Sequence, residues 1–131
     1  MIVDSSALVA IVVEEDGHER LLAALAAPDA VAGIGTPTVA ELGIVLSARL
    51  RTDARGLVGA LLDHLEIAEV SFTDAHWRAA VDAYWRYGRG RHAAGLNFGD
   101  CLTYAVASLA NQPLLCVGDD FAATDLVAAQ L

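Results

Sequence analysis

Carboxylates occur at several points of the sequence where a strand is expected to end or a helix to begin. Asp4 directly follows a short apolar run at the N-terminus, and Asp119 and Asp120 follow a second apolar run in the segment VGDDF. Asp100 lies in the first turn of an expected helix, and Glu41 lies inside another. Several carboxylates together with water and phosphate oxygens form the kind of site that Mg²⁺ or Mn²⁺ prefers. These residues therefore predict metal-dependent chemistry on a phosphate group, provided that the fold brings them together.

Glu41 is the acid that local structure explains least well. The residues three, four and seven positions after it are Ile44, Val45 and Ala48, so Glu41 shares a helix face with an apolar stripe. An isolated buried carboxylate is costly, but several carboxylates become favourable when they share a divalent cation. The alternative is a glutamate at the edge of its helix whose side chain extends to water.

The other acids have plausible local roles as well. Asp4 could cap the helix that follows it, since aspartate is a favoured N-cap residue. Asn97 and Asp100 have the spacing of a capping box, in which an acid is also favoured by the helix dipole. Asp119 and Asp120 could simply be turn residues. Taken singly, these readings compete with metal binding, and only the combined pattern favours a site.

The acids can meet because apolar runs alternate with amphipathic stretches along the whole chain. The expected strands are Met1–Asp4, Ala30–Ile34, Glu69–Phe72 and Leu114–Val117, with a possible small fifth strand at Leu126–Ala129. The expected helices are Ser6–Val13, Gly17–Ala27, a helix from the Thr36 cap to Leu50, Asp53–Glu66, a helix from the Thr73 cap to Tyr87, and Phe98–Ala110 capped by Asn97. Strands separated by helices predict an α/β fold with a parallel sheet, in which ligands bind at the carboxyl ends of the strands.

Composition limits the possible functions further. A chain of 131 residues with 56% apolar residues predicts one domain, residues 1–131, with one core. No apolar stretch is long enough to span a membrane and no basic leader is present, so we expect a cytoplasmic protein. All eight cationic side chains are arginines, which excludes the lysine-dependent phosphate-binding loop and Schiff-base chemistry. The net charge of −9 argues against a broad basic surface for nucleic acid and is compatible with metal ions or a basic partner.

One short segment could nevertheless contact RNA. Arg86, Arg89 and Arg91 lie within six residues, and Tyr84 and Trp85 precede them. Arginine forks suit phosphates, and aromatic rings can stack on unpaired bases. We expect this segment to orient single-stranded RNA beside Asp100, although the aromatic residues could instead belong to the core while the arginines remain in solvent.

The whole pattern resembles the PIN domain, and within it the VapC toxins of VapBC toxin–antitoxin modules. The residues that carry the resemblance are Asp4-Ser5-Ser6, Thr38-Val39-Ala40-Glu41, Asn97-Phe98-Gly99-Asp100, Gly118-Asp119-Asp120-Phe121 and Thr124-Asp125. The resemblance covers essentially the whole chain and implies a three-layer α/β/α sandwich around a parallel sheet of four to five strands. It also implies an endoribonuclease that uses Mg²⁺, or alternatively Mn²⁺, to activate the attacking water.

The resemblance assigns roles to individual residues. Asp4, Glu41 and Asp100 match the three core acids, and Asp120 is the favoured fourth because it directly precedes Phe121, with Asp119 as the other candidate. Asp4, Asp100 and one or both of these last acids are the expected metal ligands. Ser6 and Asn97 match polar residues that support the acids. The implied partners are RNA, a VapB-type antitoxin and a second copy of the chain in a homodimer.

Three other classes of function are weighed against this hypothesis. A PIN-fold module without activity would act only by binding, but the complete set of acids argues against it. A metal-dependent phosphatase lacks its D-x-D motif here, because Ser5 and Ser6 follow Asp4. A receiver-like phosphoacceptor domain needs a lysine, which this chain does not have.

Overall fold

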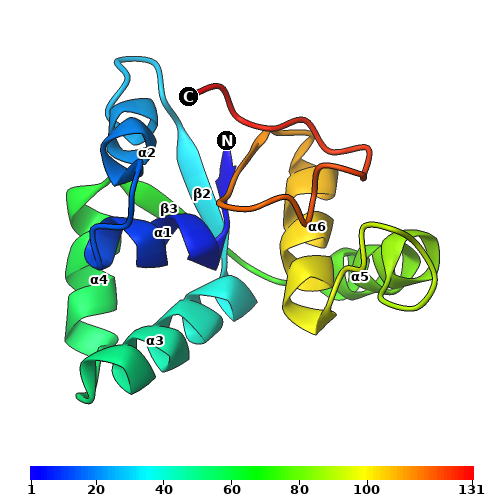
Figure 1. Cartoon of the computed structure of the whole chain (residues 1–131), viewed down its shortest axis with the longest axis horizontal. Helices are drawn as coiled ribbons and strands as arrows, with labels where there is room; N and C mark the ends of the chain where they lie inside the picture. Colours follow the sequence, from blue (N-terminus) through cyan, green and yellow to red (C-terminus); the bar gives the residue numbers. More distant parts are fainter.

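A computed structural model describes all residues, 1–131, of the chain (Figure 1). Four short strands alternate with six helices, as the apolar and amphipathic runs predict. The strands are β1 (Ile2–Val3), β2 (Ala32–Gly35), β3 (Ile67–Val70) and β4 (Leu114–Leu115). The helices are α1 (Ser5–Val12), α2 (His18–Leu25), α3 (Thr36–Leu50), α4 (Arg55–His64), α5 (Asp74–Tyr87) and α6 (Phe98–Ala110).

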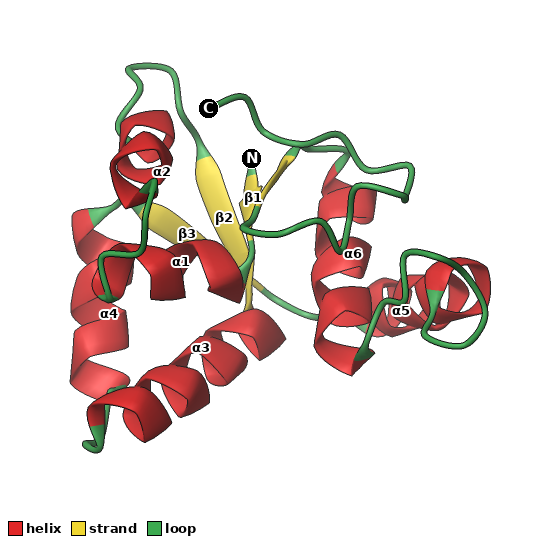
Figure 2. Cartoon of the chain, in the orientation of Figure 1, coloured by secondary structure: helices red, strands yellow, loops and turns green.

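The strands form one parallel sheet in the order β3-β2-β1-β4. Consecutive residues of a strand point to opposite faces, and the two hydrophobic clusters follow this alternation. Ile2 and Leu114 belong to the cluster shared with α5 and α6, whereas Val3 and Leu115 belong to the cluster shared with α1 to α4. Helices therefore cover both faces of the sheet, as Figure 2 shows, and the predicted three-layer α/β/α architecture is confirmed.

Glycine in β2 lets helix α6 approach the sheet closely. A Cβ added at Gly35 would lie 2.8 Å from Cγ2 of Val106, which is closer than real Cβ contacts come. This close contact holds α6 against the sheet near the carboxyl end of β2. Figure 1 shows the first turns of α1, α3 and α6 gathered near the carboxyl end of β1, which is where the sequence predicts a ligand site.

The helices and strands begin and end within two residues of the predicted positions, and three differences have a clear physical reason. The predicted strand Glu69–Phe72 begins two residues earlier, because Ile67 is the buried residue that pairs with Ala32. The N-cap of α3 is Gly35 and not Thr36, since Thr36 already has helical conformation next to Pro37. The possible fifth strand is reduced to a single bridge between Leu114 and Ala128. None of the helices is both long enough and apolar enough to cross a membrane.

Candidate active site

Asp4 lies at the carboxyl end of β1 and is held by hydrogen bonds on both carboxylate oxygens. Its side chain is 8% exposed. Oδ2 accepts from the backbone N–H of Ser6 at 3.0 Å and from the Ser6 hydroxyl at 2.6 Å. Oδ1 accepts from the Thr103 hydroxyl at 2.8 Å. Asp4 is thus the N-cap of α1. It also lies close enough to Glu41 and Asp100 to raise their pKa values, so one residue both caps the helix and lies beside the other acids.

Ser6 and two threonines connect Asp4 to the rest of the fold. Ser6 Oγ accepts from the backbone N–H of Val117 at 3.0 Å, which links Asp4 to the segment after β4. The Thr103 and Thr38 hydroxyls lie 3.2 Å apart and join α6 to α3. Both threonines are almost completely buried. Ser6 therefore contacts Asp4 through both its backbone N–H and its hydroxyl. Its role in catalysis stays a prediction.

Glu41 projects from the second turn of α3 toward the N-terminus of α6. A Cβ added at Gly99 would lie 2.9 Å from Oε2 of Glu41, so the carboxylate rests directly against the glycine that precedes Asp100. Partial burial raises the pKa of Glu41, and the negative charges of Asp4 and Asp100 raise it further, while the Ser5 hydroxyl opposes them.

The prediction that Glu41 lies above a buried stripe is wrong, because Ile44 is 71% exposed and Ala48 is exposed as well. The buried residues of α3 are Thr38, Leu42 and Leu46. Glu41 is partly covered because its carboxylate lies against Gly99 of α6.

Asp100 lies in the first turn of α6 and is half-buried. Its Oδ2 accepts from the backbone N–H of Asn97 at 2.9 Å, and Asn97 Oδ1 accepts from the backbone N–H of Asp100 at 2.9 Å. This is the predicted capping box. Burial is the largest cause that raises the pKa of Asp100; the Asn97 N–H and Arg89 lower it, and the charges of Asp120 and Asp4 raise it. Asp100 therefore lies within electrostatic reach of two other acids.

Asp119 and Asp120 lie in the exposed segment after β4. Neither side chain makes a hydrogen bond within the protein. Asp120 is among the causes that raise the pKa of Asp100, whereas Asp119 is not, so the fold favours Asp120 as the acid that joins the cluster. Cys116 lies beside these acids: burial and four neighbouring aspartates raise the pKa of its thiol to about 11. The thiol is consequently protonated at neutral pH and is not a metal ligand in that form.

Asp4, Glu41, Asp100 and Asp120 together provide carboxylate oxygens that suit a hard divalent cation, and we call them the acid cluster. As these side chains stand, no group of three or more His, Cys, Asp or Glu residues is arranged to hold a metal ion. Burial is the largest cause of the raised pKa values of Glu41 and Asp100, and repulsion by the neighbouring carboxylates raises them further. The donor chemistry fits Mg²⁺ or Mn²⁺, and a bound cation would remove this repulsion.

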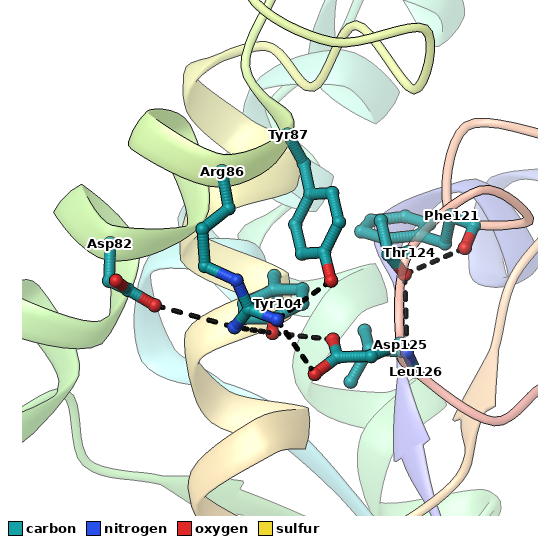
Figure 3. Close-up of polar contacts among 8 residues, drawn as sticks. All are labelled: Asp82, Arg86, Tyr87, Tyr104, Phe121, Thr124, Asp125 and Leu126. Atoms are coloured by element: carbon teal, nitrogen blue, oxygen red, sulfur yellow. Dashed lines mark hydrogen bonds and ion pairs between the residues drawn. The ribbon is translucent and has the colours of Figure 1, made fainter.

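The three arginines predicted to contact RNA occupy different environments. Arg89 follows α5 and is close enough to Asp100 to lower its pKa. Arg91 lies over the Trp85 ring, with its guanidinium carbon 3.7 Å from the ring centroid, and donates to the Trp85 carbonyl at 3.1 Å. Arg86 is directed elsewhere and donates to Tyr87, Tyr104 and Asp125 (Figure 3).

Sequence reasoning overlooked the two buried threonines. Each lies three residues from an acid on the same helix: Thr38 precedes Glu41, and Thr103 follows Asp100. Residues three apart share a helix face. Their spacing could therefore have indicated that they face the acid cluster, but nothing in the sequence shows that Thr103 reaches Asp4, ninety-nine residues away.

Comparison with known proteins points to a single family. The model of the PIN domain matches residues 1–126. The chain is 50% identical over 126 residues to ribonuclease VapC36 of Mycobacterium tuberculosis, covering 96% of this chain and 91% of that protein. The crystal structure of M. tuberculosis VapC20, a sarcin-ricin loop cleaving toxin, superposes with a TM-score of 0.79 at 18% identity over 99% of this chain and 98% of that one. A toxin–antitoxin complex from Klebsiella pneumoniae gives a TM-score of 0.71 at 18% identity over 98% and 97% of the two chains.

Proposed function

Since this chain belongs to the PIN-domain family and groups with its VapC ribonucleases, we propose that its acid cluster hydrolyses RNA with a divalent metal ion. The chain is accordingly a ribonuclease of the toxin type, and ribonucleases of this family generally depend on a divalent metal. The observation that carries the proposal is the meeting of Asp4, Glu41 and Asp100 from three separate elements, where burial and then the charges of Asp4 and Asp100 raise the pKa of Glu41.

The surroundings of each acid suit it to a different role in metal binding or proton transfer. Asp4 and Asp100 are oriented by hydrogen bonds to hydroxyl and backbone donors, so they are the proposed direct ligands of the metal. Burial and the charges of Asp4 and Asp100 raise the pKa of Glu41, which suits its carboxylate to accept a proton from the attacking water or to bind the metal through water. Asp120 completes the donor set from the exposed side, with Asp119 as the adjacent alternative.

A divalent ion at this cluster would supply a water of lowered pKa and would neutralise charge on the phosphate oxygens. The protein's own contribution is to hold the carboxylates in place: Thr103 and Ser6 orient Asp4, and Asn97 orients Asp100. The proposed metal is Mg²⁺, with Mn²⁺ as a substitute of the same oxygen preference.

Arg89 is the proposed RNA contact nearest to the site. Its exposed guanidinium is near Asp100, where it could bind a phosphate adjacent to the scissile bond. The proposed contacts of Arg86 and Arg91 have less support, because both side chains are engaged with other residues. An RNA strand approaching a chain of net charge −9 needs such a local cation.

The partners are inferred from the family. An antitoxin partner is supported by the VapC relatives and by the toxin–antitoxin complex of similar fold. A homodimer remains a proposal, for which an exposed apolar groove of about 500 Å³ between α5 and α6, bordered by Trp77, Val81 and Phe98, offers a surface. Sedimentation or light scattering of the purified chain tests it. The expected cytoplasmic location likewise remains a prediction.

The decisive experiment is cleavage of a structured RNA by the purified protein with and without Mg²⁺. We expect cleavage that EDTA abolishes, that Mn²⁺ restores, and that Asp100→Asn lowers by roughly a hundredfold or more while the melting temperature is retained. Asp63→Asn is the matched control, because Asp63 is an exposed aspartate on α4. Full cleavage by folded Asp100→Asn protein, or cleavage indifferent to EDTA, would overturn the proposal. An RNA-binding protein without any cleavage would favour a module that acts only by binding.

A further inference from the structure

A polar network outside the acid cluster joins α5, α6 and the C-terminal segment (Figure 3). Asp125 is bound through both carboxylate oxygens: Tyr104 donates to Oδ1 at 2.6 Å, and Arg86 donates to Oδ2 at 3.2 Å. Arg86 also donates to the Tyr104 hydroxyl at 3.2 Å and to the Tyr87 hydroxyl at 2.8 Å. We call Asp125, Tyr104 and Arg86 the Asp125 clamp.

We propose that Asp125 is a positioning residue that, through Tyr104 and Arg86, sets the place of Asp120 relative to Asp100. The proposal rests on the proposed function, because it gives the clamp a role in assembling the metal site. Asp125 does not touch the acid cluster itself. It acts on the segment Val117–Asp125, which carries Asp120.

The segment Val117–Asp125 has few other attachments. Residues 117 to 120 are exposed, and the side chain of Asp120 makes no hydrogen bond within the protein. Before Asp120, the segment is attached by the hydrogen bond from the Val117 N–H to Ser6. After Asp120, the side chain of Phe121 is buried against α6 and β4, and the Thr124 hydroxyl donates to the Phe121 carbonyl at 2.7 Å. The next attachment is Asp125, which accepts from Tyr104 and Arg86. Asp120 is therefore located by attachments on both sides of it.

The clamp and the acid cluster share helix α6. Tyr104 is one helical turn after Asp100, so both project from the same face of one rigid element. One helix thus presents Asp100 directly and, four residues later, holds the segment that carries Asp120. A change in the register of that segment would change the separation of the two carboxylates.

The clamp also opposes a repulsion that the cluster creates. Asp120 and Asp100 carry like charges near each other, which favours movement of the exposed segment away from α6. Asp125 remains ionised, because the Tyr104 hydroxyl and Arg86 lower its pKa, and burial with the Asp125 charge raises the pKa of Tyr104 to about 12. The charge-assisted bonds of the clamp are consequently present throughout the neutral range.

The test compares Asp125→Asn and Tyr104→Phe with Asp82→Asn. Asp82 is the matched control, because it also accepts from Arg86, at 3.5 Å, but belongs to α5 and does not hold the C-terminal segment. In the metal-free protein, we expect both clamp variants to speed hydrogen exchange of the amides of residues 117–122, with little change in the first turn of α6. Calorimetric titration with Mg²⁺ alone should show affinity weakened by roughly tenfold, as for other residues that orient ligands. Asp82→Asn should leave both measurements unchanged.

A double-mutant cycle distinguishes positioning from simple stabilisation. If Asp125 acts through Asp120, Asp125→Asn should lower cleavage in the wild-type background, through kcat and the Mg²⁺ requirement, but add little in an Asp120→Asn background. The proposal would be overturned if Asp125→Asn lowered cleavage by the same factor in the wild-type and Asp120→Asn backgrounds. It would also be overturned if the clamp variants changed neither hydrogen exchange nor Mg²⁺ affinity. Tyr104→Phe serves where Asp125→Asn unfolds, since it removes only one hydroxyl. A wild-type protein that cleaves no RNA would refute the proposed function, while exchange and Mg²⁺ binding would still decide on the clamp.

Discussion

The hydroxyl of Thr103 donates a 2.8 Å hydrogen bond to Oδ1 of Asp4, and this bond joins α6 to the carboxyl end of β1. The two residues are ninety-nine positions apart, and both are buried. Asp100 lies one turn before Thr103 on the same helix, so the bond also sets where Asp100 stands relative to Asp4. A neutral, buried hydroxyl thus orients one of the acids of the proposed site.

Removing that hydroxyl should damage both stability and activity. Thr103→Val keeps the shape of the side chain but leaves a buried carboxylate oxygen without its donor, which costs about 1–3 kcal/mol of unfolding free energy. We expect cleavage to fall by roughly 10–100-fold as Asp4 loses its orientation. Denaturant unfolding and RNA cleavage measure the two effects. Thr103→Ser should restore most of both, and equal losses in Thr103→Ser and Thr103→Val would contradict a role for the hydroxyl.

Neutralising Glu41 should stabilise the metal-free protein. The pKa of Glu41 is raised by burial and by Asp4 and Asp100, so the folded state holds its proton more tightly than the unfolded chain does. The stability that protonated Glu41 contributes is complete below pH 4.5, the ordinary pKa of a glutamate, and is lost as the pH rises through the higher pKa of the folded state. Glu41→Gln should therefore melt at a higher temperature than wild type at pH 7, and the difference should shrink as the pH approaches 4.5.

Magnesium should reverse that order. A ligand that binds only the folded state adds about 2.7 kcal/mol when its concentration is a hundred times its Kd. Wild type should gain more from Mg²⁺ than Glu41→Gln does, because the variant has lost a carboxylate. Thermal melts of wild type and Glu41→Gln, each with EDTA and with Mg²⁺, give the four melting temperatures to compare. A variant less stable than wild type at pH 7 in EDTA would show that Glu41 is not repelled by its neighbours.

Arg89 should matter more for RNA than Arg91 does. Arg89 lies near Asp100, whereas Arg91 is engaged with the ring and carbonyl of Trp85. Arg89→Ala should weaken RNA binding by several-fold and reduce the salt dependence of binding by about one ion, while Mg²⁺ affinity changes little. Binding to an uncleavable RNA, measured at several salt concentrations, tests this. An equal or larger loss from Arg91→Ala would indicate that RNA crosses the Trp85 side of α5.

Cys116 reports on the acids that surround it. With a pKa of about 11, its thiol should react with iodoacetamide at pH 8 roughly tenfold or more slowly than an ordinary cysteine. Asp120→Asn removes one of the charges that raise this pKa, and alkylation should then become faster. Mass spectrometry separates Cys116 from the more buried Cys101, and Asp63→Asn is the control. An unchanged rate in Asp120→Asn would mean that Asp120 does not lie beside Cys116.

Local patterns predicted the elements well because their signals are short-range. Helix α6 and its cap at Asn97 follow from a capping box beside an apolar face, and both are present as predicted. The N-cap of α3 was predicted one residue too late, and the last strand was predicted where one bridge forms, because both depend on how neighbouring segments pack. Arg86 shows the limit for side chains: charge and spacing indicated RNA, but the partners of Arg86 come from α6 and the C-terminal segment.

The sequence by itself determined the alternation of strands and helices, because apolar periodicity acts over a few neighbouring positions. Its motifs also resemble those of the PIN family, and this resemblance is what singles out Asp4, Glu41 and Asp100 as the proposed site acids. Only the tertiary structure decided how these acids are held and which neighbours they affect. Thr103 reaches Asp4, Gly99 makes room for Glu41, and Asp125 anchors the segment of Asp120. These contacts join residues distant in sequence, and they form only when both faces of the sheet are packed and the first turns of three helices meet at one end of it.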